Sequence, residues 1–184
     1  MRNMSIDWNS FRVNSQSADG IRIEFENLCR HLFANEFLSS NNYNRYLHAN
    51  PNNPGIETEP VYDETNNQWI GFQAKYFEAK VDYGQIEKSA REAVNHYAGK
   101  IDAIYLFCNK PLTTSSLNKT TDILNKASIQ LKLITDNAIL DLVIEKYSYL
   151  GSYYFGNHSI SNEWIREHTE SIFEQFGERY NRKI

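Results

Sequence analysis

Two short apolar runs near the middle of the chain constrain its fold more than any other feature. They read "IDAIYLFCN" (101–109) and "IQLKLIT" (129–135), and such nearly continuous apolar runs are typical of strands buried on both faces. Each is followed by a segment with a helical pattern, "TTSSLNKTTDILNKA" and "DNAILDLVIEKY", and we expect Asp136 or Asn137 to cap the second helix. Strand–helix alternation requires crossover connections, so we predict an α/β fold whose helices cover a sheet.

The first half of the chain predicts further elements of this fold. From 17 to 38, apolar residues recur every three or four positions, which indicates a helix that Asp19 could cap. Residues 56–62 and 69–77 read as two strands of a hairpin, because "DETNNQ" between them supplies turn residues near Thr65 and Asn66. An antiparallel hairpin joined to crossover units gives a mixed central sheet flanked by helices.

The remaining segments complete the predicted element order. A helix is expected from about Tyr83 to Tyr97. The order is then helix, hairpin, helix, strand, helix, strand, helix, and together these elements form a core over 1–146. The first 15 residues are polar and are expected to be loose or an edge piece. The aromatic segment 147–184 is a C-terminal extension, which either folds back as an extra layer or forms an interface with a following domain or protomer. An amphipathic stripe marks its last part, at Trp164 or Ile165, His168, Ile172 and Phe176.

Length, charge and cysteine content limit the class of protein. The 184 residues suffice for one domain with a core, and hydrophobic residues make up 41% of them. The net charge of −4 argues against a strongly basic, non-specific nucleic-acid binder but leaves room for an enzyme with a local positive groove. No apolar run is long enough to span a membrane, and "MRNMSIDWNSFRVN" lacks the apolar core of a secretory signal. Cys29 and Cys108 are predicted to be free thiols in a cytoplasmic protein.

One polar constellation on the hairpin demands an explanation. In the apolar run "WIGFQAKYF", alternation places Gln73 and Lys75 on one face, and a buried, unpaired lysine would be expensive. The hairpin turn brings Glu57 across from Gln73 or Ala74. Glu59 competes with Glu57, because simple alternation puts both on one face and Pro60 can introduce a bulge.

Glu26 is a further candidate, on the edge of the apolar stripe of the first predicted helix. It is either a catalytic acid or the partner of Arg22 or Arg30 in an ion pair. Gln85 and Lys88, at the start of a later helix, either contact a DNA backbone or belong to a solvated surface.

An acid on one strand and a Gln-x-Lys on the next resemble the motif of the PD-(D/E)xK, or restriction-endonuclease-like, nucleases, and in particular their Mrr-like branch, where Gln commonly replaces the second acid. "NPGIETEPV", "WIGFQAKYF", "VDYGQIEKS" and "IDAIYLFCNKPLT" are similar to the N-terminal nuclease domain of anti-phage STAND NTPases of the Avs class. The similarity covers about 20–146. No Walker A sequence is present, so the chain is expected to be either an excised effector domain or a stand-alone version.

The chemistry of phosphodiester hydrolysis assigns roles to these residues. Mg²⁺, with Mn²⁺ as an alternative, prefers hard oxygen ligands. Glu57 would supply a carboxylate, Gln73 an amide oxygen and the Ala74 backbone a carbonyl. Lys75 would orient or deprotonate the attacking water and stabilise charge on the phosphate. Glu26 would hold a second metal ion or position a water.

The resemblance therefore implies a Mg²⁺-dependent DNA endonuclease of low sequence specificity, acting on double-stranded DNA in anti-phage defence. It also implies a homo-oligomer, or an attached or partner STAND ATPase. Two rival hypotheses use the same fold without catalysis: a nucleic-acid-binding module, and an interaction domain that regulates an ATPase. Other constellations are weak, because the histidines show no zinc-site spacing; they are His31, His48, His96, His158 and His168.

Overall fold

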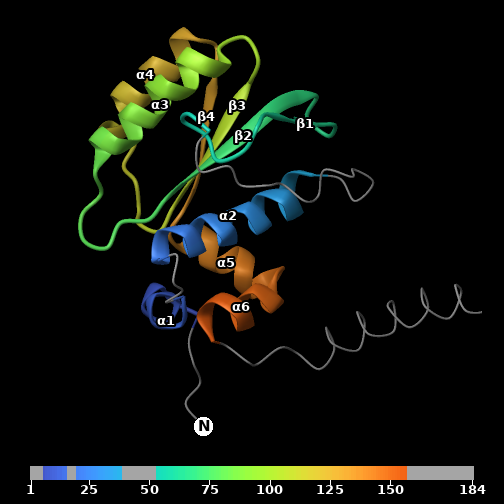
Figure 1. Ribbon diagram of the computed structural model, residues 1–184, viewed down its shortest axis with the longest axis vertical. Helices are drawn as coiled ribbons and strands as arrows, with labels where there is room; N and C mark the ends of the chain where they lie inside the picture. Colours follow the sequence, from blue (N-terminus) through green and yellow to red (C-terminus); the bar gives the residue numbers. More distant parts are fainter. Residues whose placement is uncertain (1–5, 16–19, 39–52, 157–184) are drawn as a thin grey trace, which may run out of the picture.

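A four-stranded mixed sheet forms the centre of the molecule (Figure 1). The computed structural model describes residues 6–15, 20–38 and 53–156. The strands are β1 (Val61–Asp63), β2 (Gln68–Lys75), β3 (Ala103–Cys108) and β4 (Gln130–Thr135), in the spatial order β1-β2-β3-β4. β1 pairs antiparallel with β2, whereas β2, β3 and β4 run parallel. The predicted α/β class and mixed sheet are confirmed.

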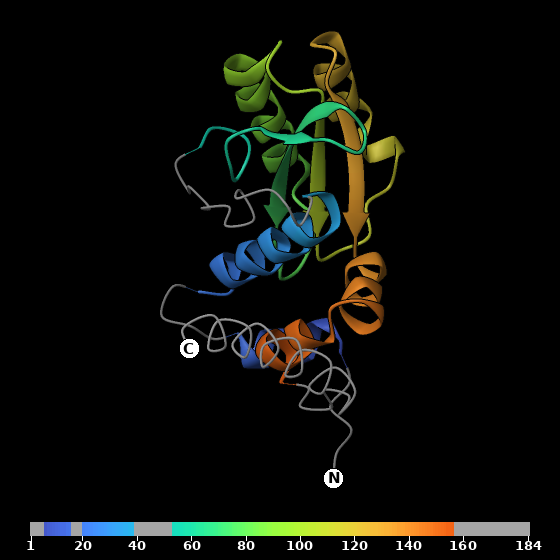
Figure 2. The same ribbon diagram turned by 90° about the vertical axis from the view of Figure 1, so that its right-hand side faces the viewer.

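Helices cover both faces of the sheet because its central strands are apolar on both sides. All six residues of β3 are buried. Tyr105 and Phe107 pack toward α2 (Ile21–Phe37). Ile104 and Leu106 pack into the opposite layer, formed by α3 (Tyr83–Tyr97) and α4 (Asn118–Lys126). Figures 1 and 2 show α3 and α4 side by side on one face and α2 across the other.

Most central elements lie where the sequence predicts them, but the strand predicted over 56–62 is wrong for most of its length, because β1 is only Val61–Asp63. The hairpin turn at 64–67 and the helix Tyr83–Tyr97 agree with the expected positions, and a short 3₁₀ turn, Ser115–Leu117, precedes α4. The expected cap of α2, Asp19, lies outside the described residues. The predicted burial of β4 on both faces is wrong, because β4 is an edge strand and Leu133 is 42% exposed. Helices cover the apolar side chains of β4 only in part.

The expectation that the N-terminal 15 residues are loose is corrected for residues 6–15. These include the helix α1 (Trp8–Asn14), which a capping box begins: the Ser10 backbone N–H donates to the Asp7 side chain, and the Asp7 N–H donates to Ser10 Oγ. Phe11 is fully buried in the α2-side core. The Trp8 indole Nε1–H donates to Asp136 Oδ1 at 2.9 Å. Asp136 stands at the expected N-cap position of the following helix, but its side chain makes no capping bond there.

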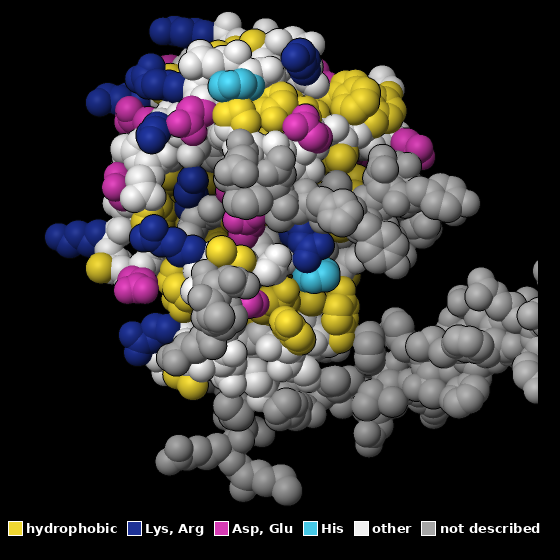
Figure 3. Space-filling view, viewed as in Figure 1, with side chains coloured by type: hydrophobic (Ala, Val, Ile, Leu, Met, Phe, Trp, Pro, Cys, Tyr) yellow, Lys and Arg dark blue, Asp and Glu magenta, His cyan; other side chains and the backbone are white. Residues whose placement is uncertain are grey.

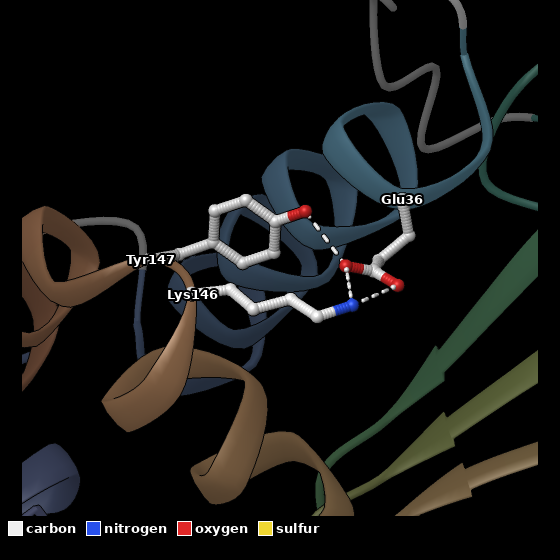
Figure 4. Close-up of polar contacts among 3 residues, drawn as sticks. All are labelled: Glu36, Lys146 and Tyr147. Carbon is white, nitrogen blue, oxygen red and sulfur yellow. Dashed lines mark hydrogen bonds and ion pairs between the residues drawn. The ribbon is translucent and has the colours of Figure 1, made fainter.

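Two further helices close the lower part of the molecule. α5 (Asn137–Glu145) follows β4, and α6 (Ser148–Phe155) packs against α5 and α1. Between them, Lys146 Nζ donates to both Glu36 oxygens at 3.0 and 3.1 Å, and the Tyr147 hydroxyl donates to Glu36 at 2.7 Å (Figure 4). This cluster fastens the α5–α6 junction to α2. The predicted amphipathic stripe near 164–176 lies outside the described residues.

Two remaining expectations concern thiols and membranes. Cys29 and Cys108 are both buried free thiols, as predicted. None of the helices within the described ranges is long and apolar enough to cross a membrane.

Candidate functional site

The segment that carries Glu57 runs beside β2. The Glu57 backbone N–H donates to the Phe72 carbonyl at 2.8 Å, and the Ala74 N–H donates to Glu57 Oε1 at 3.2 Å. Continuing the Val61–Ile70 register back along the segment would place Glu57 opposite Ala74, but the bond to the Phe72 carbonyl shows that the pairing is shifted by two residues. The backbone of Glu57 therefore lies beside Phe72, and not across from Gln73 or Ala74 as the hairpin pattern predicts, while its side chain reaches along β2 to the Ala74 N–H.

Gly55 sets the path of this segment. Its φ of +78° lies in the left-handed region, and a Cβ there would fall 2.3 Å from the Ala93 nitrogen and 2.4 Å from the Ser89 carbonyl oxygen. Both atoms belong to the backbone of α3, so only glycine allows the chain to pass this close. The sequence shows the Pro-Gly turn but not this contact with the helix.

Gln73 holds the same segment to the sheet. Its side chain is 3% exposed, and its amide Nε2 donates to the Gly55 carbonyl. Phe72 and Tyr76, its neighbours in the alternating pattern, belong to the core on the α2 side. The predicted division of β2 into two faces is confirmed. The amide nitrogen of Gln73, whose oxygen is the predicted metal ligand, binds the Gly55 carbonyl and so holds the segment to the sheet.

The charges of Glu57, Lys75 and Glu26 act on one another from three elements: the segment before β1, the last residue of β2, and α2. Burial raises the pKa of Glu57, while the charge of Lys75 and the Ala74 N–H act to lower it. Burial also raises the pKa of Glu26 to about 7. The negative charge of Glu57 adds to that rise, and Lys75 and Arg30 oppose it. Two half-buried carboxyl groups and an ammonium group therefore share one electrostatic environment.

Glu59, the rival to Glu57, faces elsewhere. Its side chain is exposed. Burial raises the pKa of Tyr97, and the charge of Glu59 and its hydrogen bond with Tyr97 add to that rise. Tyr97 is the last residue of α3, so Glu59 serves the α3 side of the segment while Glu57 serves the α2 side. Sequence alternation alone could not separate them.

The remaining residues that the sequence analysis names are Arg30, Gln85 and Lys88. Arg30 lies one helical turn after Glu26, and its charge acts on the Glu26 carboxyl, so one predicted electrostatic partner is present. Gln85 and Lys88 are exposed on α3, where Lys88 Nζ lies 3.9 Å from Glu92 Oε1. Their contact with DNA stays a prediction.

The donor set fits a hard cation that takes few protein ligands. Within the described ranges, no three His, Cys, Asp or Glu side chains cluster closely enough to hold a metal ion by themselves. Glu57 and Glu26 provide two neighbouring carboxylates whose raised pKa values reflect burial and, at Glu26, repulsion. A divalent cation would relieve that repulsion, and Mg²⁺ is commonly bound by one or two carboxylates while it keeps several waters.

The sequence matches no protein-family model and has no significant match among curated proteins. The functional assignment therefore depends on the geometry above and on the motif.

Proposed function

We propose that this protein is a metal-dependent DNA endonuclease of the PD-(D/E)xK type. The observation that carries the proposal is the electrostatic coupling of Glu57, Lys75 and Glu26, which come from three different elements and lie in a partly buried environment. Paired carboxylates with shifted pKa values beside a cationic side chain are characteristic of catalytic and binding sites. The mixed sheet with an initial hairpin, and α2 packed across β2, supports a restriction-endonuclease-like core.

The residues of the chain have distinct tasks in this proposal. Glu57 and Glu26 would hold Mg²⁺ or Mn²⁺, with the Gln73 amide oxygen and the Ala74 carbonyl as further oxygen donors. The bound ion would neutralise phosphate charge and make a water molecule a better nucleophile. Lys75 would orient that water and stabilise the negative charge that develops on the phosphate in the transition state. Gly55 and Gln73 hold the Glu57 segment in place, because both fix it between β2 and α3.

A nucleic-acid-binding module without catalysis is the second candidate. Gln73 favours it, because the side chain is neutral and its amide nitrogen is engaged by Gly55. One anionic oxygen fewer weakens metal binding when no substrate phosphate is present. In both cases we propose double-stranded DNA as the partner, a role in anti-phage defence, assembly of several chains or attachment to a STAND ATPase, and action in the cytoplasm.

Plasmid cleavage by wild type and three variants tests the proposal. We expect metal-dependent nicking that falls at least about a hundredfold in Glu57→Ala and in Lys75→Ala. Glu59→Ala is the matched control, since this carboxylate is two residues away but turned toward Tyr97, and it should cut within about twofold of wild type. Chelation by EDTA should abolish cleavage.

Two results would contradict the proposal. Equal loss in Glu59→Ala and Glu57→Ala, with both variants folded, would mean that the site is misplaced. A folded wild-type protein that binds DNA but cuts none with Mg²⁺ or Mn²⁺ would favour the binding module.

A further inference from the structure

A cavity of about 380 Å³ lies between α2 and α6. Asn27, Arg30 and His31 of α2 line it from one side, and tyrosines of α6, namely Tyr149, Tyr153 and Tyr154, line it from the other. In the space-filling view, a basic and a histidine side chain lie together in the middle of the visible face, directly above a group of hydrophobic side chains (Figure 3). The cavity therefore combines a cation with several aromatic rings.

The lining groups are held in place by contacts of their own. The Asn35 amide donates to the Tyr149 hydroxyl at 2.7 Å, which ties α6 to α2. The rings of Tyr153 and Tyr154 meet edge to face with centroids 4.7 Å apart, and His31 lies 6.3 Å from Tyr154. Tyr153 is nevertheless 72% exposed, so the outer face of its ring is open to a ligand.

The charge of the cavity favours an anionic group. Burial lowers the pKa of His31, and the adjacent Arg30 charge lowers it further, which favours the neutral imidazole. Arg30, whose charge also acts on Glu26, brings a guanidinium group to the cavity, and the several N–H donors of such a group suit phosphate oxygens. Aromatic rings beside such a cation suit a nucleobase, since bases stack on tyrosine without regard to sequence.

Size and position narrow the ligand. A volume of about 380 Å³ is at the lower end of the range for small-molecule pockets, enough for one nucleotide but not for a duplex. Arg30 follows Glu26 by four residues, about 6 Å along the helix axis. One bound strand could therefore reach both the cavity and the candidate site.

We propose that the α2–α6 cavity binds one unpaired nucleotide of the DNA strand on which the Glu57–Lys75 site acts, with its phosphate at Arg30 and its base on Tyr153. This inference rests on the proposed nuclease function for the placement of the strand. It implies that the preferred substrate has a single-stranded or easily opened stretch beside the cut.

Fluorescence anisotropy with a labelled 12-nucleotide single strand and the matching blunt duplex tests the proposal. The buffer contains Ca²⁺ in place of Mg²⁺, so that oxygen ligands are engaged while cleavage is disfavoured. Tyr153→Ala should weaken single-strand binding about tenfold, and Tyr153→Phe should retain it, because the stacking face remains. Duplex affinity should stay unchanged. Tyr62→Ala, on the hairpin, is the matched tyrosine control and should bind like wild type.

Salt titration gives a second, independent readout. Arg30→Gln should lower the slope of log K against log salt by about 0.7, the value for one phosphate contact on a single strand. Arg91→Gln, an exposed arginine on α3, should leave the slope unchanged. A loss of stability alone would weaken binding without changing the slope in this selective way.

Several results would overturn the proposal. They are equal single-strand affinity for wild type and Tyr153→Ala, an equal loss on single strand and duplex, and no single-strand binding up to about 100 µM protein. Failure of the two proposals is distinguishable. If plasmid cleavage is absent but the Tyr153 and Arg30 effects hold, the cavity assignment stands and the nuclease proposal falls. If cleavage depends on Glu57 and Lys75 while Tyr153→Ala binds normally, only the cavity assignment falls.

Discussion

The carboxyl group of Glu26 reports on the electrostatics of the candidate site without any substrate. Its pKa is about 7 in the folded protein against 4.5 for an ordinary carboxyl. The fold thus favours the protonated form, and the ionised form lowers stability. This cost is absent below about pH 4.5, grows between 4.5 and 7, and is complete above 7. The unscreened cost would be about 3 kcal/mol, which solvent around a half-buried group reduces to about 1 kcal/mol.

We therefore predict that Glu26→Gln stabilises the metal-free protein by about 1 kcal/mol at pH 8 and by nearly nothing at pH 4.5. Urea unfolding in EDTA at both pH values measures this difference. Glu64→Gln, an exposed carboxyl in the hairpin turn, is the control and should change stability little at either pH. Equal stabilisation by Glu26→Gln at both pH values would show that packing, and not charge, is responsible.

Gly55 and Gly99 distinguish the two costs of replacing a glycine: backbone strain and a clash of the new side chain with its neighbours. Both have positive φ, +78° and +75°, but a Cβ added at Gly55 would lie within 3 Å of backbone atoms of α3, while one added at Gly99 would meet nothing within 4 Å. Gly99→Ala should cost about 1 kcal/mol through backbone strain alone. Gly55→Ala should cost at least about 2 kcal/mol more, because α3 must move as well.

Urea unfolding of the two glycine variants checks this prediction. Gly55→Ala should also impair plasmid cleavage at a temperature where it is still folded, because Glu57 is two residues away. Equal destabilisation of Gly55→Ala and Gly99→Ala would contradict the close approach of the segment to α3.

At the residue scale, the sequence predicts a contact when the two residues are close together along the chain. The hairpin pattern brings Glu57 to β2, because both lie on one local unit, but it predicts Gln73 or Ala74 as the opposite residue, whereas the backbone pairs with Phe72 and only the side chain reaches Ala74. It could not separate Glu57 from Glu59, since that choice depends on Tyr97 at the distant end of α3. The sequence pattern also does not show that Glu26 lies near Lys75, because the packing of α2 across the sheet leaves no periodic signal.

At the scale of elements, α1 is an integral part of the core. Phe11 is fully buried and its ring contacts Phe25 and Tyr76, so Phe11→Ala should remove about 3–5 kcal/mol of stability. Val13→Ala is the control on the same helix, because Val13 is 57% exposed and should cost less than about 1 kcal/mol. Thermal unfolding of both variants measures the difference. A similar small loss in both would mean that α1 is not docked in solution.

The sequence predicts those elements whose own pattern is long or strongly apolar. β3 is buried along its whole length, and α3 has a regular apolar stripe from Ile86 to Tyr97, so both are visible in the pattern. α1 has seven residues and one fully buried side chain, too few for a period to show. α6 is a helix rich in Tyr, Gly and Ser, whose composition resembles a loop. β4 looks buried because its position at the sheet edge is a property of topology and not of sequence.

At the scale of the whole molecule, the described residues of each chain offer one candidate site, formed by Glu57 and Lys75 at β2 and Glu26 on α2. Under the proposed function, one chain would act on one phosphodiester at a time. With a net charge of −4, the proposed DNA substrate would have to be held by local cations and not by a general positive field. Cutting both strands of a duplex in one binding event would then call for two chains, and a two-fold pair matches the antiparallel strands of DNA.

This arrangement predicts the order of products in plasmid cleavage. Nicked circles should accumulate first, and linear DNA should rise more steeply than in proportion to protein concentration, because two chains must meet on one duplex. The measurement is the ratio of linear to nicked DNA over a hundredfold range of protein at fixed plasmid, with about 100 mM salt to limit crowding of chains on the DNA. Gel filtration over the same range tells whether the pair forms before it binds DNA.

Linear product that rises in strict proportion to protein, with no nicked intermediate, would mean that one chain cuts both strands or that the pair is already complete at the lowest concentration. A gel-filtration profile of a monomer throughout would leave only the first of these readings, and it would contradict the requirement for two chains.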